Sequence, residues 1–305
     1  MSITLADTIR ETTREHLVKS KSLLFAQNVT AVGWIANTVP SDIPNNEGIV
    51  ELPTSDCSNS AIVVGAALAK LFPIYVIRYQ GFLWYNAASI VNYAAKSWQM
   101  WGVSCPMLIR GLAMEGGIGP VASHAHHSML MRMPGLAVFA PITPNEWMAA
   151  WNFMYEYRTP VFVSEHRKTY QLTNDSLAEL EVRHDKPKVT VVGISYARVA
   201  AAAAAKKSTI PFNTYGINVL SPLNIPNEII DELKQTKLGV VVDCDYNKCG
   251  ASEHIALDLS LRTGAKVYAL GLDDRIAGFS KDADVLTPSP DKIKRFVEDI
   301  VKIND

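Results

Sequence analysis

The stretch from Glu51 to Lys96 alternates short apolar runs with helical patterns, and this alternation constrains the fold more than any other feature of the chain. A short apolar run leads to Asp56, and a helix rich in small residues is predicted over Ala61–Lys70. The segment Ile74–Arg78 is predicted to be a strand that is apolar on both faces. Strands that alternate with helices over short connections predict a parallel sheet with crossover helices, which is an α/β fold.

The same alternation returns in the second half of the chain, after a charged segment that lacks periodicity. We therefore expect two doubly wound α/β domains, residues 1–170 and 187–305, joined by a linker over residues 171–186. A length of 305 residues is enough for two full cores. In the first domain the other expected elements are a helix over Leu5–Lys19, a helix that begins at Pro144, and strands over Leu23–Ala26, Ala31–Ile35, Met107–Ile109, Leu136–Ala140 and Val161–Ser164.

The composition describes a globular protein and excludes several classes of function. A net charge of −1 gives no reason to expect binding to nucleic acid or to an anionic membrane. Cys57, Cys105, Cys244 and Cys249 are scattered, so reduced thiols and a cytoplasmic location are expected. The N-terminus is charged and lacks the pattern of a signal peptide, and no apolar stretch has the length of a membrane span.

Two side chains follow predicted strands and are candidates for a binding site. Ligands of parallel sheets bind outside the carboxyl ends of the strands, where Asp56 and Phe82 are expected. The carboxylate could bond the edge of a flat heterocycle while the aromatic ring stacks on its face. The alternatives are that Asp56 caps the helix after it and that Phe82 packs in a core or a subunit interface.

Three histidines, His124, His126 and His127, form a cluster after a glycine-rich segment. A histidine suits proton transfer because its pKa lies near neutrality. A zinc site is a weak alternative without an acidic or cysteine partner nearby, and plain surface histidines are another. Arg110 follows the strand Met107–Ile109 and is a candidate for binding a substrate carboxylate or phosphate, although a structural ion pair explains it equally well.

An ordered set of motifs covers nearly the whole chain and resembles one known family. The motifs are PTSD, VGAAL, FPI, IVNYAAK, CPMLIRG, MPGLAVFAPITP and TPVFVSEHRKTY. In this order and spacing they resemble the beta subunit of the thiamine-diphosphate-dependent decarboxylase component of 2-oxo-acid dehydrogenases. The resemblance implies a thiamine-diphosphate-binding (pyrimidine) fold followed by a domain like the transketolase C-terminal domain.

The resemblance also assigns roles to the candidate residues. Asp56 stands where the family has a catalytic glutamate that bonds the aminopyrimidine ring of the cofactor, and it is shorter by one methylene, about 1 Å. Phe82 matches the ring that stacks on the pyrimidine. Either His127, which precedes a serine, or His124, which fits the transketolase-like spacing, matches the catalytic histidine beside the substrate. The segment Glu165–Arg167 matches the family and is expected to support folding or a subunit contact.

The chain has no Asp-Gly dipeptide, and therefore no Gly-Asp-Gly motif of the kind that holds Mg²⁺ and diphosphate in these enzymes. The resemblance thus implies half of an active site, completed by an alpha subunit that holds Mg²⁺, with beta–beta self-association and a lipoyl acyltransferase as a further partner. The expected reaction is decarboxylation of a 2-oxo acid with acyl transfer to a lipoyl group. The alternatives are a split transketolase-like subunit that transfers a ketol or aldehyde unit, and a non-catalytic scaffold subunit.

Overall fold

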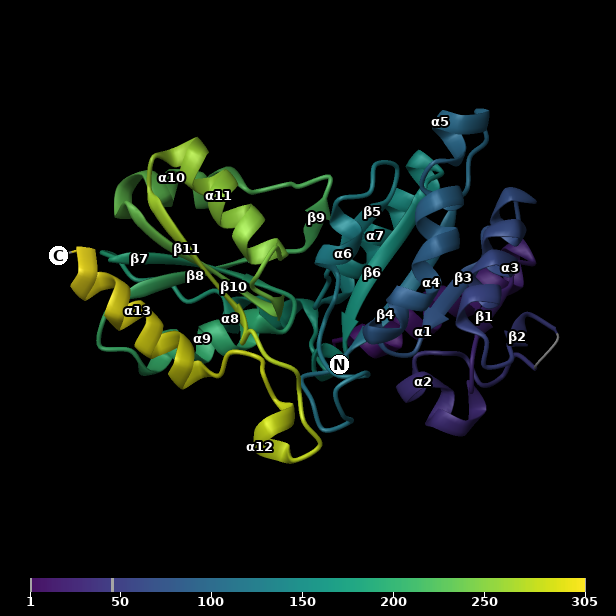
Figure 1. Cartoon of the computed structure of the whole chain (residues 1–305), viewed down its shortest axis with the longest axis horizontal. Coiled ribbons are helices and arrows are strands. Elements are labelled where there is room, and N and C mark those ends of the chain that lie inside the picture. Colours follow the sequence, from purple (N-terminus) through teal and green to yellow (C-terminus); the bar gives the residue numbers. More distant parts are fainter. Residues whose placement is uncertain (1, 45–46, 305) are drawn as a thin grey trace.

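The protein, seen in a computed structural model, consists of two parallel sheets that lie side by side, each flanked by helices (Figure 1). The structure describes residues 2–44 and 47–304. The N-terminal part of the chain forms the larger sheet and the C-terminal part forms the smaller one. This arrangement confirms the expected α/β class and its two doubly wound sheets.

The larger sheet has the strand order β2-β1-β3-β4-β6-β5-β9 among the described residues. Its pairs are parallel except the last, in which β9 runs antiparallel to β5. The strand β9 comes from the second half of the chain, so the two halves share this sheet. The strands are β1 Leu24–Ala26, β2 Ile49–Glu51, β3 Ile74–Ile77, β4 Met107–Ala113, β5 Ala137–Phe139, β6 Pro160–His166 and β9 Val219–Ser221.

Both faces of the larger sheet are covered, as parallel sheets require. Successive residues of β4 point to opposite faces because strand side chains alternate. Ile109 packs in one apolar cluster, and Leu108 packs in the cluster on the other face. The helices of this half are α1 Leu5–Ser20, α2 Gly33–Asn37, α3 Asp56–Leu68, α4 Leu83–Ser89, α5 Ser97–Trp101, α6 Ser128–Met131 and α7 Pro144–Tyr157.

The smaller sheet has the order β11-β10-β7-β8, with each described pair parallel. Its strands are β7 Val189–Ile194, β8 Phe212–Ile217, β10 Leu238–Tyr246 and β11 Lys266–Leu272. Its helices are α8 Leu177–Leu180, α9 Ala197–Lys207, α10 Asn227–Thr236, α11 Ala251–Thr263, α12 Lys281–Asp284 and α13 Pro290–Asn304. The alanine run of α9 lets this helix lie close to the sheet, where most of its alanines are buried.

The two halves are joined by polar contacts as well as by β9. Arg198 of α9 is buried and bonds Glu146 of α7 at 2.6 Å. Glu146 also accepts the backbone amide of Ile142 at the start of α7, which begins at Pro144 as expected. We propose 1–170 and 187–305 as domain limits, with the short helix α8 lying inside the connecting segment.

Two predictions of local structure are wrong. The expected strand Ala31–Ile35 is a 3-10 helix over Thr30–Val32 followed by α2, whose backbone is left-handed from Gly33 onward and therefore lacks the extended φ angles of a strand. Helix α3 begins at Asp56 and not at Ala61, which places the Asp56 carboxylate in the first turn, where the helix dipole favours it. None of the helices in the described part of the chain is long and apolar enough to cross a membrane.

Candidate active site

The Asp56 carboxylate lies in the first turn of α3, after β2, and it is partly exposed. Its Oδ1 accepts hydrogen bonds from the side-chain amides of Gln27, at 3.2 Å, and Asn86, at 3.0 Å. Gln27 follows β1, Asp56 follows β2 and Asn86 lies in α4 after β3. Side chains that follow three different strands therefore meet at this one oxygen. The amides hold the carboxylate in position, and among residues 2–44 and 47–304 no hydrogen bond engages its Oδ2.

Asn86 connects Asp56 with Phe82. Its Nδ2 also donates to the Phe82 carbonyl at 2.9 Å, and its Oδ1 accepts from the buried Tyr75 hydroxyl at 2.6 Å. Phe82 ends a 3-10 helix directly after β3, and its half-buried ring meets Tyr79 edge-on at 6.0 Å between ring centroids. The structure therefore brings the predicted carboxylate and the predicted aromatic residue to the same asparagine, at the carboxyl edge of the sheet.

Arg110 lies in the middle of β4, so its expected position after the end of this strand is wrong. The side chain is fully buried and forms a two-pronged bond with Glu165, with nitrogen–oxygen distances of 2.7 and 3.0 Å. It also donates to Thr38, and Tyr170 donates to Glu165. Because a buried arginine needs a matched carboxylate, this geometry supports the structural ion pair, and we do not assign Arg110 to substrate binding.

Gln80, which follows β3, links β4 and β6 to the histidine loop, the loop that carries His124, His126 and His127. Its buried Nε2 donates to the Gly111 carbonyl at 3.0 Å and to the Ser164 hydroxyl at 2.7 Å. Its Oε1 accepts the backbone amide of His126 at 2.7 Å. Because both polar atoms of this amide are used, in three hydrogen bonds, the loop is held in one position against the carboxyl edge of the sheet.

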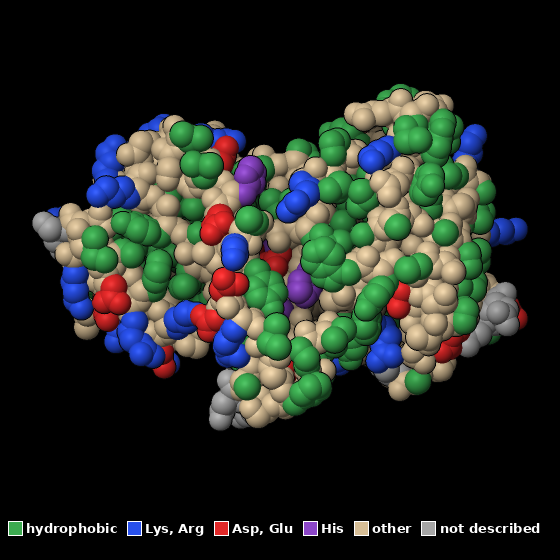
Figure 2. Space-filling view, viewed as in Figure 1, with side chains coloured by type: hydrophobic (Ala, Val, Ile, Leu, Met, Phe, Trp, Pro, Cys, Tyr) green, Lys and Arg blue, Asp and Glu red, His purple; other side chains and the backbone are tan. Residues whose placement is uncertain are grey.

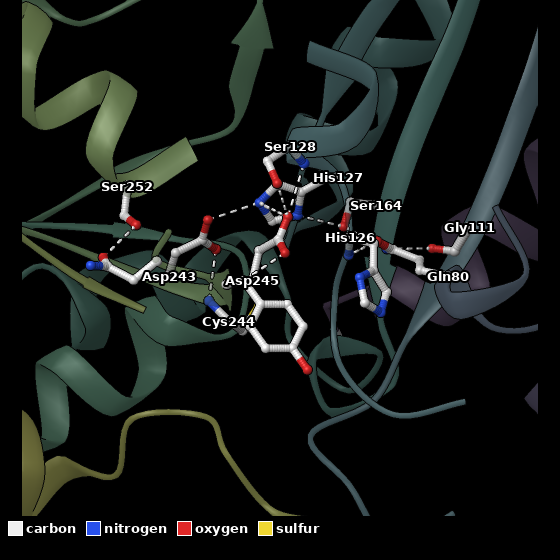
Figure 3. A network of polar contacts seen from close by, with 12 residues as sticks. Gln80, Gly111, His126, His127, Ser128, Ser164, Asp243, Cys244, Asp245 and Ser252 are labelled. Carbon is white, nitrogen blue, oxygen red and sulfur yellow. Dashed lines mark hydrogen bonds and ion pairs between the residues drawn. The ribbon is translucent and has the colours of Figure 1, made fainter. Parts of the chain in front are cut away.

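His127 lies between the two halves of the protein and has no exposed surface. Its Nδ1 contacts the Ser164 hydroxyl at 3.1 Å, and its Nε2 contacts Asp243 of β10 at 2.9 Å (Figure 3). Burial alone would lower the pKa of His127, but the carboxylates of Asp243 and Asp245 outweigh it and raise the pKa to about 9. The imidazolium is therefore the stable form at neutral pH.

Asp245 makes a second connection between the halves. Its Oδ2 accepts the backbone amide of Ser128 at 2.9 Å and the Ser128 hydroxyl at 2.5 Å (Figure 3). Burial raises the pKa of Asp245, and the charge on His127 opposes that rise. Asp245, on the smaller sheet, thus fixes Ser128, the serine that follows His127 in the family-like pattern.

The remaining two histidines have different surroundings. His124 is buried, and neither of its ring nitrogens has a hydrogen-bond partner among the described residues. The alternative of plain surface histidines is wrong for His124 and His127, because both side chains are buried. Their catalytic role stays a prediction. His126 is only partly buried, and its ring lies 5.9 Å from that of Tyr246, centroid to centroid.

A cleft of about 560 Å³ lies between α4, α6 and the connection after β10. Figure 2 shows the surface hollowed between the two lobes, with histidine and acidic side chains at the hollow. His126 and Asp245 line the cleft, together with apolar side chains such as Trp84 and Met129. In the part of the chain that the structure describes, no three His, Cys, Asp or Glu side chains are grouped as metal ligands would be.

Sequence analysis missed most of the partners of the predicted residues. Gln27, Gln80 and Asn86 are neutral amides without a motif of their own. Asp243 and Asp245 had a usable signal, because acids at the end of the apolar run Leu238–Val242 are expected at the carboxyl edge of a sheet. The sequence did not reveal that these two acids pair with His127 and Ser128, which lie more than a hundred residues earlier in the chain.

Comparison with known families decides where the chain belongs. Residues 4–173 match the family described as "Transketolase, pyrimidine binding domain". The chain belongs to the transketolase pyrimidine-binding family. The matched region contains β1–β6, and therefore Asp56, Phe82 and the histidine loop.

Relatives of this pyrimidine-binding chain confirm the resemblance seen in the sequence. The acetoin:2,6-dichlorophenolindophenol oxidoreductase subunit beta of Cupriavidus necator is 26% identical over 73% of this chain and 69% of its own length. The pyruvate dehydrogenase E1 component subunit beta of Rickettsia conorii is 24% identical over 84% and 83%. A solved structure described as a split-gene transketolase, inactive beta4 tetramer, shares the fold, with a TM-score of 0.69 and 13% identity over 98% of both chains.

Proposed function

We propose that this chain is the beta-like subunit of a two-chain thiamine-diphosphate-dependent enzyme. The observation that carries the proposal is the group formed by Asp56, Asn86 and Phe82 at the carboxyl edge of a transketolase-type sheet. The named relatives are beta subunits of oxidoreductases that act on 2-oxo acids or acetoin, which supports the same assignment.

The residues present fit the pyrimidine half of the cofactor. Asp56 keeps one oxygen free of protein partners among the described residues, as a carboxylate must to bond a ring nitrogen. Phe82, whose carbonyl bonds the same Asn86 as Asp56 does, offers a half-buried ring for stacking. When bound, thiamine diphosphate supplies the carbanion chemistry that cleaves a bond next to a carbonyl. The role of this chain is to position the ring and to hold a proton at Asp56.

We assign proton transfer near the substrate to His126 in preference to His127 and His124. His126 lines the cleft, whereas the ring nitrogens of His127 are engaged by Ser164 and Asp243. Burial lowers the pKa of His126, so its ring is neutral at pH 7 and able to accept a proton. His127 then serves to fix the loop that carries its neighbour.

A partner chain is needed for the charged half of the cofactor. The sequence lacks the Gly-Asp-Gly motif, so we propose that an alpha subunit with this motif holds the diphosphate and Mg²⁺. Exposed aromatic side chains on the segment from α4 to α5 support a subunit interface there, and Figure 2 shows hydrophobic side chains gathered over this region. They are Trp84, Tyr85, Tyr93, Trp98 and Trp101, with exposed fractions of 65, 55, 50, 68 and 48%.

We propose decarboxylation of a 2-oxo acid, with acyl transfer to the lipoyl group of an acyltransferase, as the reaction. Transfer of a ketol or aldehyde unit by a split transketolase-like enzyme is the second candidate, favoured by aspartate in place of glutamate at position 56. A scaffold subunit without catalysis is the third.

Reconstitution tests the proposal and separates these candidates. The chain would be purified alone and with an alpha-type chain that carries Gly-Asp-Gly, in the presence of thiamine diphosphate and Mg²⁺. We expect 2-oxo-acid-dependent reduction of an artificial electron acceptor only in the mixture. Ketol transfer between sugar phosphates without that reduction would favour the split transketolase, and an alpha chain that is equally active alone would favour the scaffold.

A further inference from the structure

Asp284 is an acid with no exposed surface that reaches from α12 into the glycine-rich loop of the other half. Its Oδ2 accepts the backbone amides of Gly117, at short range, and Ile118, at 3.0 Å. The Ser123 hydroxyl shares its one hydrogen between the Gly119 carbonyl, at 2.8 Å, and the Asp284 Oδ1, at 3.2 Å. Figure 1 shows α12 below the two sheets, beside this loop. Each of these donors is neutral, so the carboxylate lies in a cradle that suits any small anion.

The backbone of the loop builds this cradle. Gly116, Gly117 and Gly119 have φ angles of 146°, 83° and 87°, a conformation that side chains with a Cβ rarely adopt. Successive amides in such a turn point to one side and form an anion-binding concavity. A Cβ on Gly116 would lie 2.9 Å from the Asp284 carbonyl oxygen, so the loop leaves room only for a close backbone approach.

His124 is the second observation that points to a ligand. It follows Ser123 directly, has a φ of 74°, and is only 2% exposed. Both ring nitrogens are buried without a partner among the described residues, which is a costly state for a polar group. Burial lowers the pKa of His124 to about 4, while the charge and the backbone of Asp284 act in the opposite direction. The position of His124 directly after Ser123, with its amide bonded to the Met114 carbonyl, places it next to the cradle.

The segment that carries Asp284 is irregular and partly exposed, with an apolar anchor of its own. Residues 273–280 have no regular secondary structure, and Ile276 and Phe279 are 80% and 88% exposed. The Arg275 guanidinium bonds the Ala283 carbonyl within the same segment, at 2.8 Å. Ala277 and Leu286 pack on Leu272 in a buried apolar cluster, so the segment is anchored on both sides of Asp284. The cradle is therefore best opened by removing the Asp284 carboxylate.

We propose that the amides of Gly117 and Ile118, the Ser123 hydroxyl and the His124 ring form a subsite for the anionic group of the substrate, and that Asp284 masks it in the single chain. The subsite takes a carboxylate or a phosphate monoester, because these groups accept several hydrogen bonds at once. The inference deepens the proposed function and rests on it, since a 2-oxo acid offers the first group and a sugar phosphate the second.

Calorimetric titration of the full chain with sodium phosphate and with sodium pyruvate, at constant ionic strength, tests this subsite. We expect Asp284→Ala to bind one of the two anions at least about tenfold more tightly than the wild type, because the internal competitor is gone. Asp274→Ala, which removes an exposed acid of the same segment, is the matched control and should behave as the wild type. Preference for pyruvate or for phosphate identifies which anionic group the subsite takes.

Adding Ser123→Ala to the Asp284→Ala variant should weaken the new binding by about fivefold to tenfold, the loss of one hydrogen bond to an anion. If Asp284→Ala fails to fold by circular dichroism, Asp284→Asn, which keeps the shape without the charge, decides by the same criterion. Binding no tighter than in the wild type, or binding that is indifferent to Ser123, overturns the proposal. Because no thiamine diphosphate or partner chain is present, such a failure is distinct from a failure of the reconstitution assay.

Discussion

Replacing Asp56 by alanine is expected to lower the turnover of the reconstituted two-chain enzyme by about 10²- to 10⁴-fold, the range that proton-transfer groups contribute. The variant removes the carboxylate that Gln27 and Asn86 hold in place and leaves their amides without an acceptor. Turnover would be measured by acceptor reduction at saturating cofactor. Glu51→Ala, which removes an exposed acid at the end of β2, is the matched control and should retain normal activity.

Asp56→Glu refines this prediction. The longer side chain displaces the carboxylate by about 1 Å, and we expect a loss of up to about a hundredfold in turnover with cofactor binding retained. Such a loss would indicate that the surrounding backbone is adapted to aspartate. Full activity of Asp56→Ala would remove the catalytic assignment and leave the scaffold subunit as the better interpretation.

Replacing His127 by leucine is expected to lower the free energy of unfolding by about 3–5 kcal/mol, because it leaves buried acids without their counter-charge. Asp243 lies 2.9 Å from the His127 ring, and both side chains are fully buried. Urea unfolding at pH 7 measures the change. His126→Asn is the matched control, since it alters the neighbouring, partly exposed ring and should change stability by less than about 0.5 kcal/mol.

The pH dependence of the same variant checks the charge on His127. The pKa of His127 is raised in the folded protein from 6.5 to about 9, so protonation favours the folded state. The stabilisation is fully present below pH 6.5 and is lost as the pH rises through about 9. The difference in stability between the wild type and His127→Leu should therefore shrink between pH 6 and about pH 9.5. A difference independent of pH would show that packing alone is responsible.

The sequence was sufficient for the regular part of the fold and for naming Asp56 and Phe82 as candidates, which the structure brings to one asparagine. Continuous apolar runs gave β3 and β4, because strands buried on both faces leave no polar alternation. The strand predicted over Ala31–Ile35 is wrong because a left-handed turn begins at Gly33, and apolar content does not reveal such a turn. Asp56 and Phe82 became candidates through their places after strands and through the resemblance to a known family, and their role stays a prediction.

The connections between distant segments could not be predicted. Asn86 meets Asp56 across 30 residues, and Asp243 meets His127 across 116, and no local pattern encodes either pairing. The burial of Arg110 was equally hidden, because its partner Glu165 lies on a neighbouring strand. Pattern analysis therefore identifies which residues face the sheet edge, whereas tertiary packing decides which of them stay accessible to a ligand.

Calorimetric titration of thiamine diphosphate and Mg²⁺ into the purified chain, alone and mixed with the alpha-type chain, tests most directly whether this chain holds only half of the cofactor. We expect the mixture to bind with a Kd near or below about 10 μM, corresponding to about −7 kcal/mol, and the chain alone to show no saturation up to about 1 mM. Tight, Mg²⁺-dependent binding by the chain alone would contradict the proposal of a shared site.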